Sequence, residues 1–185
     1  MSNVHDITVI AGLSGVGKTF VIEKLVRESD SYFHLSAGSL IKKRLANLDR
    51  DQLRELEKNS ILANQYLMTE QFQEELNTID RRFSIIFDAH MVIDNDHELI
   101  EVPYEIFEQL SPTRIILISD EAEKIIERRK FDNLRKRPIR SIPEIIEQQN
   151  RSIMLAQEHS SRLSIPFIEI KAGDIQSLSN AILSR

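Results

Sequence analysis

The segment from residue 12 to residue 19 constrains the fold of this chain more than any other feature. It reads Gly-Leu-Ser-Gly-Val-Gly-Lys-Thr, which matches the pattern G-x-x-x-x-G-K-[ST] at every fixed position. The apolar run Ile7 to Ala11 before it predicts a buried strand, and the apolar residues between Val21 and Val26 share one helical face. A glycine-rich turn between such a strand and such a helix predicts a phosphate-binding P-loop.

Each residue type in this loop has a chemical purpose. Glycine lets the backbone wrap around a phosphate without a Cβ in the way, and the loop N–H groups and the helix N-terminus point at the anion. Lys18 can reach the β- and γ-phosphates, and the Thr19 hydroxyl can bind Mg²⁺. We therefore expect ATP and Mg²⁺ as cofactors; the alternative is a chance glycine turn before a helix. The expected nucleotide-binding residues are Gly12, Leu13, Ser14, Gly15, Val16, Gly17, Lys18, Thr19 and Phe20, with Lys18 also catalytic.

Short apolar runs alternate with longer amphipathic segments in the rest of the chain, as in βα units around a parallel sheet. Strands are predicted at 7–11, 32–35, 85–87, 114–118 and 167–170, and helices at 37–46, 51–58, 60–80, 103–110, 141–163 and after 120 and 174. Residues 89–102 resemble a loop with one short extended piece at 99–102. In the helix over 60–80, the buried stripe is expected at Leu62, Tyr66, Thr69, Phe72, Leu76 and Ile79. The fold class is α/β, a P-loop NTPase fold with a five-stranded parallel sheet and helices on both faces.

Composition excludes several classes of protein. The chain has 185 residues and no cysteine, which rules out disulfides, cysteine zinc sites and thiol catalysis. The net charge of −5 argues against a nucleic-acid partner, which usually requires a basic protein. No apolar run is long enough to cross a membrane, and the polar N-terminal residues lack a signal-peptide core. We expect a cytoplasmic protein with no membrane partner.

Two aspartates follow predicted strands. Asp88 is where a Walker B acid should lie, and it could hold Mg²⁺ through water; the alternative is a turn or cap aspartate. Asp120, with Glu123, instead resembles a helix capping box. A second capping box is predicted at Ser141 and Glu144. The acidic segment 94–98 lacks the glycine and spaced glutamate of a calcium loop, so a solvated turn is expected.

A basic run occupies residues 128–140 of this otherwise acidic chain. Phosphoryl transfer spreads negative charge over the transferred oxygens, and arginines that close over the site stabilise that charge and exclude water. Arg135 and Arg137 are the expected catalytic pair. The alternatives are a solvated helix face or a patch that binds a polyanion.

Several segments together resemble the adenylate kinase and wider nucleoside monophosphate kinase family, most closely its archaeal-type branch. The resemblance covers nearly the whole chain. The segments are the P-loop, Ser36-Ala37-Gly38-Ser39-Leu40-Ile41-Lys42, Asp49-Arg50-Asp51-Gln52-Leu53-Arg54, Asp88-Ala89-His90, and Arg128-Arg129 followed by Arg135 and Arg137. The chain departs from the family pattern in three places. Lys42 stands where the family usually has an acceptor-binding arginine, and no Gly-Phe-Pro-Arg follows Asp88 as it does in the bacterial-type enzymes. Asp132 falls near the position where the bacterial-type enzymes carry a phosphate-binding arginine.

The resemblance implies a single P-loop kinase domain over residues 1–185, with an acceptor-binding region at 36–80 and a lid at 128–142. It implies that Arg128 stacks on adenine. It also implies an acceptor pocket lined by Ser36, Gly38, Ser39, Lys42 and His90. From the residues alone, Ser36 is equally typical of a helix N-cap, Lys42 of a surface lysine and His90 of a hydrogen-bonded structural histidine.

Three functions stay open at this point. The first is a nucleoside monophosphate kinase that moves the γ-phosphate of ATP directly to AMP or another nucleotide acceptor. The second is a P-loop kinase for another small acceptor, and the third is an accessory ATPase that switches with a protein or RNA partner. A GTPase is not expected, because no Asn-Lys-x-Asp segment occurs. The archaeal-type relatives suggest a homo-oligomer.

Overall fold

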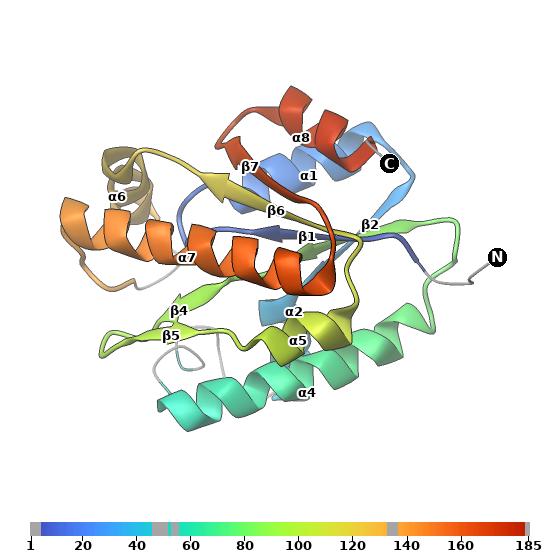
Figure 1. The fold of residues 1–185 in the computed structure, drawn as a ribbon, viewed down its shortest axis with the longest axis horizontal. Coiled ribbons are helices and arrows are strands. Elements are labelled where there is room, and N and C mark those ends of the chain that lie inside the picture. Colours follow the sequence, from blue (N-terminus) through green and yellow to red (C-terminus); the bar gives the residue numbers. More distant parts are fainter. Residues whose placement is uncertain (1–4, 46–51, 53–55, 133–136, 184–185) are drawn as a thin grey trace.

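A five-stranded parallel sheet forms the centre of the computed structural model (Figure 1), which describes residues 5–45, 52, 56–132 and 137–183. Across the sheet the strands are β2 (Tyr32–Ser36), β3 (Ser84–Asp88), β1 (Ile7–Ala11), β6 (Arg114–Ser119) and β7 (Phe167–Lys171). All neighbouring pairs run parallel. The α/β fold class predicted from the sequence is therefore confirmed.

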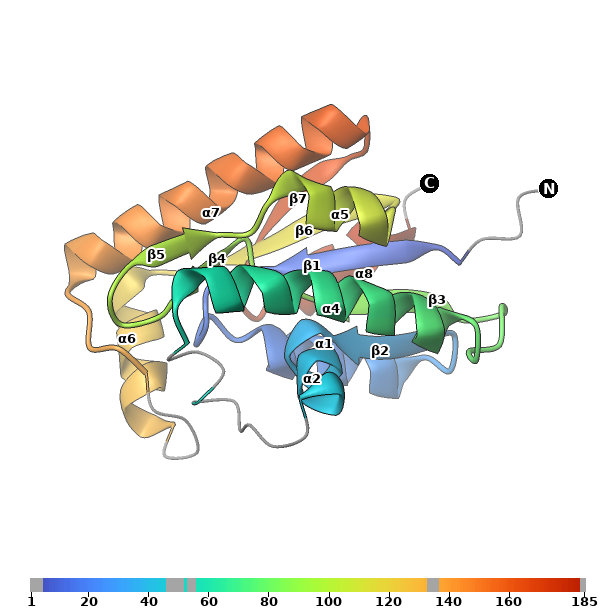
Figure 2. The ribbon, with the colours of Figure 1, turned by 90° about the horizontal axis from the view of Figure 1, so that it is seen from below.

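Helices cover both faces of the sheet (Figures 1 and 2). On one face lie α1 (Lys18–Glu28) and α8 (Ile175–Leu183); on the other lie α4 (Lys58–Leu76), α5 (Tyr104–Leu110) and α7 (Ile142–Leu163). The helix α2 (Ala37–Arg44) contacts α4, and α6 (Ala122–Phe131) contacts α7. The helix predicted at 51–58 lies mostly outside the described residues.

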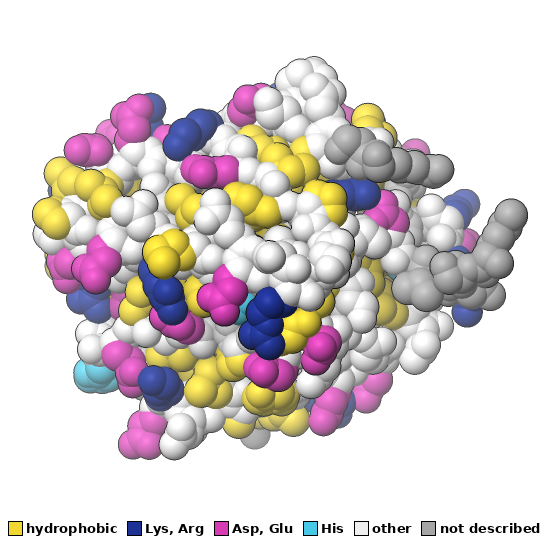
Figure 3. Space-filling model, in the orientation of Figure 1, with side chains coloured by type: hydrophobic (Ala, Val, Ile, Leu, Met, Phe, Trp, Pro, Cys, Tyr) yellow, Lys and Arg dark blue, Asp and Glu magenta, His cyan; other side chains and the backbone are white. Residues whose placement is uncertain are grey.

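The central strands of the sheet form the middle of the hydrophobic core. Every residue of β1 and β6 is buried, which explains why both strands are almost entirely apolar in sequence. Phe87 on β3 packs edge-to-face against Phe72 on α4, with ring centroids 4.9 Å apart. The outer surface is different: the face in Figure 3 carries acidic and basic side chains next to one another.

The buried face of α4 differs from the predicted stripe. Leu62 is only half-buried and Tyr66 is 42% exposed, whereas Thr69 and Phe72 are buried as predicted. The residues that α4 does bury are Ile61, Asn64, Gln65, Met68, Thr69, Gln71 and Phe72. Three of these residues, Asn64, Gln65 and Gln71, are polar amides. The pattern of apolar residues therefore predicted a neighbouring face of the helix as the buried one. Gln71 donates to the Glu75 carboxylate at 3.0 Å, whereas Asn64 and Gln65 line a cavity.

Two local predictions about the loops were right only in part. Residues 92–101 form an antiparallel hairpin of β4 (Val92–Asp94) and β5 (Leu99–Glu101); β5 is the extended piece predicted at 99–102, whereas β4 lies where a loop was expected. The segment 94–98 is its turn, but it is not solvated throughout, because Asn95 is buried and its Oδ1 accepts the N–H groups of His97 and Glu98.

The two predicted capping boxes had opposite outcomes. Ser141 and Glu144 form theirs at the start of α7. No box forms at the start of α6, whose N-cap Glu121 makes no side-chain cap bond, and the Asp120 carboxylate pairs with Arg128 instead. The Asp120 carboxylate therefore pairs with a charged group eight residues along the chain instead of forming a local cap. Among the described residues, no helix is both long and apolar enough to cross a membrane.

His159 makes the fold sensitive to acid. It is buried on α7 beside Tyr104 and Phe107, and its Nε2 donates to the Val102 carbonyl oxygen at 3.2 Å. Burial lowers the pKa of His159 below its ordinary value, and this outweighs the nearby carboxylates of Glu158 and Glu105.

We expect the free energy of unfolding to fall as the pH drops below about 6.5, because the unfolded imidazole takes up a proton that the folded site disfavours. Above that pH both states are neutral and the contribution is complete. His159→Gln removes the titration but keeps an N–H donor for Val102, so urea unfolding at pH 7.5 and pH 5.0 should differ less in the variant than in the wild type. An equal difference in both proteins would show that His159 does not titrate on unfolding.

Candidate functional site

The turn after β1 requires glycine. Gly12 has a φ of 145°, and a Cβ there would lie 2.6 Å from the Ile118 carbonyl oxygen on β6. Gly17, at the start of α1, has a φ of 106°. An L-residue rarely adopts either conformation, and at Gly12 a side chain would also collide with backbone. These glycines let the loop pass close to the end of β6 before it enters α1.

The N-terminus of α1 is uncapped by side chains. Its N-cap is Gly17, which has no side chain with which to cap the helix, and the first turn contains no acidic residue. The positive end of the helix dipole is therefore not neutralised by an acidic side chain of its own first turn. An external phosphate is the ligand that such a helix start binds.

Lys18 is 5% exposed, and its side chain folds back toward Gly12 at the start of the loop. Its Nζ donates to the Gly12 carbonyl oxygen at 2.7 Å and lies 3.8 Å from Asp88 Oδ1. His90 Nδ1 lies 2.9 Å from the same Gly12 oxygen and 3.4 Å from Lys18 Nζ. Since a carbonyl only accepts, the contact with Gly12 places a proton on Nδ1 of His90. The ammonium is therefore held by the Gly12 carbonyl oxygen and Asp88, and it lies beside His90, whose Nδ1–H cannot accept a hydrogen bond from it.

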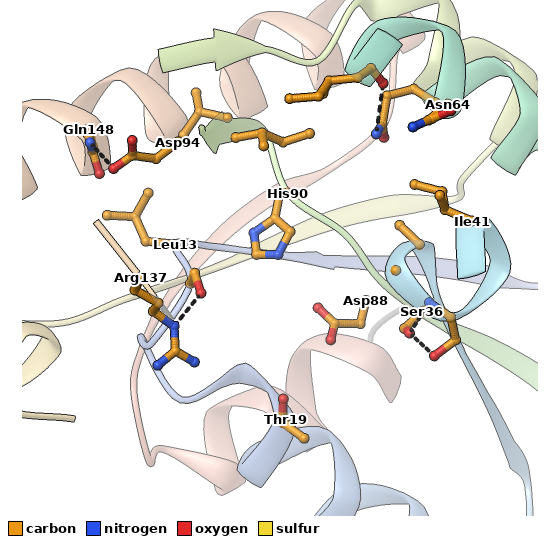
Figure 4. A pocket seen from close by; sticks show the side chains of 18 of the residues that line it. Leu13, Thr19, Ser36, Ile41, Asn64, Asp88, His90, Asp94, Arg137 and Gln148 are labelled. Carbon is orange, nitrogen blue, oxygen red and sulfur yellow. Dashed lines mark hydrogen bonds between the residues drawn. The ribbon is translucent and has the colours of Figure 1, made fainter. Parts of the chain in front are cut away.

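Asp88 and Thr19 fit a Mg²⁺ site. Asp88 ends β3 and is paired in register with Ile10 on one side and Ser36 on the other. Its Oδ1 is buried and accepts no hydrogen bond within the described part of the chain. The Thr19 side chain faces the same space (Figure 4). Mg²⁺ keeps several waters and takes phosphate oxygens as ligands, so one carboxylate and one hydroxyl suffice.

These residues open on a cavity of about 570 Å³ at the carboxyl end of the sheet. Its wall combines the P-loop, the starts of α2 and α4, the β4–β5 hairpin and two arginines. Of the residues predicted for the site, the cavity brings together Leu13, Ser14, Thr19, Ser36, Gly38, Ser39, Asp88, His90 and Arg137. Lys42 is exposed on α2 and does not line this cavity, and Phe20 is 64% exposed. Arg135 lies outside the described residues.

Ser36 has the structural role that was the alternative from sequence. It is the N-cap of α2, where its Oγ accepts the Ser39 N–H at 3.2 Å and donates to the Ser39 hydroxyl at 2.8 Å. Both serines nevertheless line the cavity. The cap fixes two hydroxyls beside Asp88, so the structural and the binding interpretations are compatible.

Two guanidinium groups are anchored to a single P-loop residue. Arg129 Nε donates to the Ser14 carbonyl oxygen and Arg137 Nε to the Ser14 hydroxyl, each at 2.9 Å. Nη1 of each arginine is buried without a hydrogen-bond partner among the described residues. Burial, with Arg137 and Arg140 nearby, lowers the pKa of Arg129 to about 10, so it is still charged at neutral pH. Unused donors on two charged forks suit phosphate oxygens.

Arg129 and Arg140 belong to the basic run predicted from the sequence, but neither was assigned a role of its own. Adjacent arginines on a helix point about 100° apart, and nothing in the sequence shows which one faces the loop. Arg140 binds Asp94 through Nη2 at 2.8 Å and Nε at 3.1 Å, and Gln148 donates to the same carboxylate at 2.9 Å. This cluster joins Arg140 and the start of α7 to the β4–β5 hairpin.

Arg128 lies behind the loop. Its Nη1 donates to the Val16 carbonyl oxygen at 2.9 Å, and its Nη2 pairs with the Asp120 carboxylate. Asp120 is itself fixed by Gln149, which bonds its backbone N–H and C=O at 3.0 Å each. Arg128 therefore braces the P-loop from α6, and stacking on adenine stays a prediction.

Comparison with known proteins agrees with this geometry. Residues 11–146 match a family model described as an AAA domain. The chain is 30% identical to the adenylate kinase of Methanocaldococcus jannaschii over 152 residues, 77% of each protein, and 27% identical to that of Methanothermobacter thermautotrophicus over 92% of this chain and 94% of the relative. A shikimate kinase from Bacteroides thetaiotaomicron shares the fold, with a TM-score of 0.56 at 12% identity over 96% of this chain and 98% of the other. The protein is thus a member of the adenylate kinase family, built on a P-loop domain.

Proposed function

We propose that the protein transfers the γ-phosphate of Mg-ATP to the phosphate of a nucleoside monophosphate, with AMP as the first candidate. One observation carries this proposal: a single cavity has the P-loop, with Arg129 and Arg137 bonded to it, at one end and the walls of α2 and α4 at the other, with Asp88 between them (Figure 4). Two nucleotides that enter from opposite ends would meet phosphate to phosphate. The family relationship supports the same chemistry.

The catalysis we propose is positioning and charge neutralisation. The loop N–H groups and Lys18 hold the β- and γ-phosphates, while Arg129 and Arg137 donate to oxygens that gain charge during transfer. Mg²⁺ bound at Asp88 and Thr19 would neutralise charge on the β- and γ-phosphates. The contact between Arg140 and Asp94 holds the lid near the hairpin and limits access of water. No side chain needs to become covalently phosphorylated.

Asp88→Asn should lower kcat by at least roughly 10²-fold and raise the Mg²⁺ concentration needed for half-maximal rate, because metal-based charge stabilisation is worth several kcal/mol. The amide is nearly isosteric but lacks the negative charge. A Mg²⁺ titration of the initial rate measures both effects. Asp80→Asn, an exposed aspartate after α4, is the control and should behave as the wild type. Unchanged Mg²⁺ dependence in Asp88→Asn would exclude Asp88 as the metal-binding acid.

A substrate panel tests the proposed function as a whole. ADP release from Mg-ATP would be followed with nucleoside monophosphates, deoxynucleoside monophosphates and nucleosides as acceptors. The proposal predicts fast ADP formation that depends on a monophosphate. Acceptor-independent release at the same rate throughout the panel would contradict it and favour an ATPase.

A further inference from the structure

An acidic side chain lines the cavity in which we propose that phosphates bind. Asp94 is the last residue of β4, its side chain is 11% exposed, and it lies at the cavity wall with Gln148 of α7 (Figure 4). A carboxylate at this place repels phosphate, so its presence requires a physical reason. The hydrogen bonds that Asp94 accepts indicate what that reason is.

Asp94 is held by two side chains. Arg140 donates to Oδ1 through Nη2 at 2.8 Å and to Oδ2 through Nε at 3.1 Å, and Gln148 donates to Oδ2 through Nε2 at 2.9 Å. Burial acts to raise the pKa of Asp94, but the hydrogen bonds from Arg140 and Gln148 outweigh it and hold the pKa below its ordinary value. Asp94 is therefore a negatively charged anchor for the Arg140 guanidinium at neutral pH. Arg140 itself does not line the cavity, so any effect of this pair on the reaction is indirect.

Arg140 lies three residues after Arg137, and the chain between them is stiff. Pro138 has a fixed φ and restricts Arg137 to an extended backbone conformation. Ile139 is 95% exposed, so it adds almost no packing that could hold residues 137–140 in place. Three residues span at most about 11 Å, and anchoring Arg140 to the hairpin therefore limits where the backbone of Arg137 can lie.

Arg137 is the side chain that this anchor places. Its Nε donates to the Ser14 hydroxyl of the P-loop at 2.9 Å, and its Nη2 pairs with the Asp132 carboxylate. These contacts orient the guanidinium, whose buried Nη1 has no hydrogen-bond partner among the described residues. Neither contact fixes the backbone of Arg137, because the side chain between them is long and flexible. The link from Arg140 to Asp94 does so, since it holds the far end of a short segment.

The same link is not needed to hold the hairpin against α7. Arg151 of α7 pairs with Glu101 at the end of β5, with Nη2 and Oε2 2.8 Å apart, and His159 donates to the Val102 carbonyl oxygen at 3.2 Å. These contacts already join the two elements. What the pair of Asp94 and Arg140 adds is the position of residues 137–140.

We propose that Asp94 is a positioning residue for phosphoryl transfer, which acts through Arg140 to keep Arg137 over the P-loop. Gln148 orients the Asp94 carboxylate for this purpose. The unpartnered Nη1 of Arg137 then donates to phosphate oxygens that gain charge in the transition state. This inference rests on the proposed transfer to a monophosphate.

Asp94→Asn tests the proposal, because the amide keeps the shape of the side chain and removes the charge that anchors Arg140. We expect kcat to fall by roughly 10- to 100-fold, since a displacement of about 1 Å at a catalytic group has effects of that size. The KM values for ATP and AMP should change by less than about threefold, because Arg137 acts mainly in the transition state. A carboxylate that only repelled phosphate would give the opposite result, a lower KM for ATP with no loss of kcat, and that result would overturn the inference.

Glu101→Gln is the matched control. Glu101 also forms an ion pair between the hairpin and α7, but it does not line the cavity. The kcat of this variant should equal that of the wild type. A fall as large as in Asp94→Asn would show that general loosening of the hairpin, and not the position of Arg137, sets the rate.

A double-mutant cycle with Arg137→Met separates a positioning role from a purely structural one. Since Asp94 acts through Arg137, Asp94→Asn should lower kcat by less than about twofold in the Arg137→Met background. Arg140→Gln removes the other end of the link and should reproduce the effect of Asp94→Asn. Effects of Asp94→Asn and Arg137→Met that multiply would overturn the inference while leaving the transfer reaction intact, and so would a wild-type kcat in Asp94→Asn or Arg140→Gln. Absence of transfer to any monophosphate by the wild type would instead overturn the proposed function, and this inference with it.

Discussion

Lys18→Met should lower kcat/KM for phosphoryl transfer by roughly 10³-fold or more, because one positive charge aimed at the transferred phosphate is worth that much in sites of this kind. The ammonium of Lys18 lies 3.8 Å from Asp88 and is buried at the loop. In the variant, a cation from the solvent therefore cannot take its place. Methionine keeps most of the volume and the apolar stem. Initial rates with saturating Mg-ATP measure the effect.

Lys24→Met is the matched control on the same helix. Lys24 is half-exposed and makes a 3.9 Å ion pair with Glu28, so its loss should change neither rate nor stability appreciably. If Lys18→Met and Lys24→Met had the same activity while both stayed folded, Lys18 would have no part in catalysis.

Gly12→Ala should destabilise the fold by about 3 kcal/mol or more, through backbone strain at positive φ and a collision that the core resists. The new Cβ would lie 2.6 Å from the Ile118 carbonyl oxygen, in the fully buried strand β6. Either the loop or the strand must move. Urea unfolding measures the loss, and ATP binding should weaken with it because the loop can no longer wrap the phosphate.

Gly173→Ala separates strain from collision. Gly173 has a φ of 86°, but a Cβ there meets nothing within 4 Å, so only the conformational cost of roughly 1 kcal/mol applies. A Gly12→Ala protein no less stable than Gly173→Ala would show that the approach of the P-loop to β6 is not a tight constraint.

Much of the fold followed from periodicity in the sequence. β1 and β6 are buried on both faces and are almost entirely apolar in sequence, and α7 carries a capping box at its start. β4 was missed because it has three residues and ends in Asp94, whose burial depends on Arg140, a partner 46 positions away. Pairings at that separation leave no local pattern.

The site was predictable where the chemistry is local in sequence. The P-loop and Asp88 could both be predicted, because each directly follows a short apolar run that reads as a strand. The roles of the arginines could not be predicted in this way. Arg128 and Arg129 are adjacent in sequence, yet Arg129 lines the cavity and Arg128 donates to the Val16 carbonyl oxygen of the P-loop. The buried amides of α4 were not predicted because they are polar, so the apolar pattern of the helix placed its buried face away from them.

The central claim is that the γ-phosphate of ATP moves to a nucleotide held in the same cavity. The most direct measurement follows ATP labelled at its γ-phosphate, mixed with Mg²⁺, AMP and the protein, and separates the labelled products. We predict that the label appears in ADP formed from AMP before any appears as free phosphate. Label found only as free phosphate, at a rate that AMP does not alter, would contradict this account.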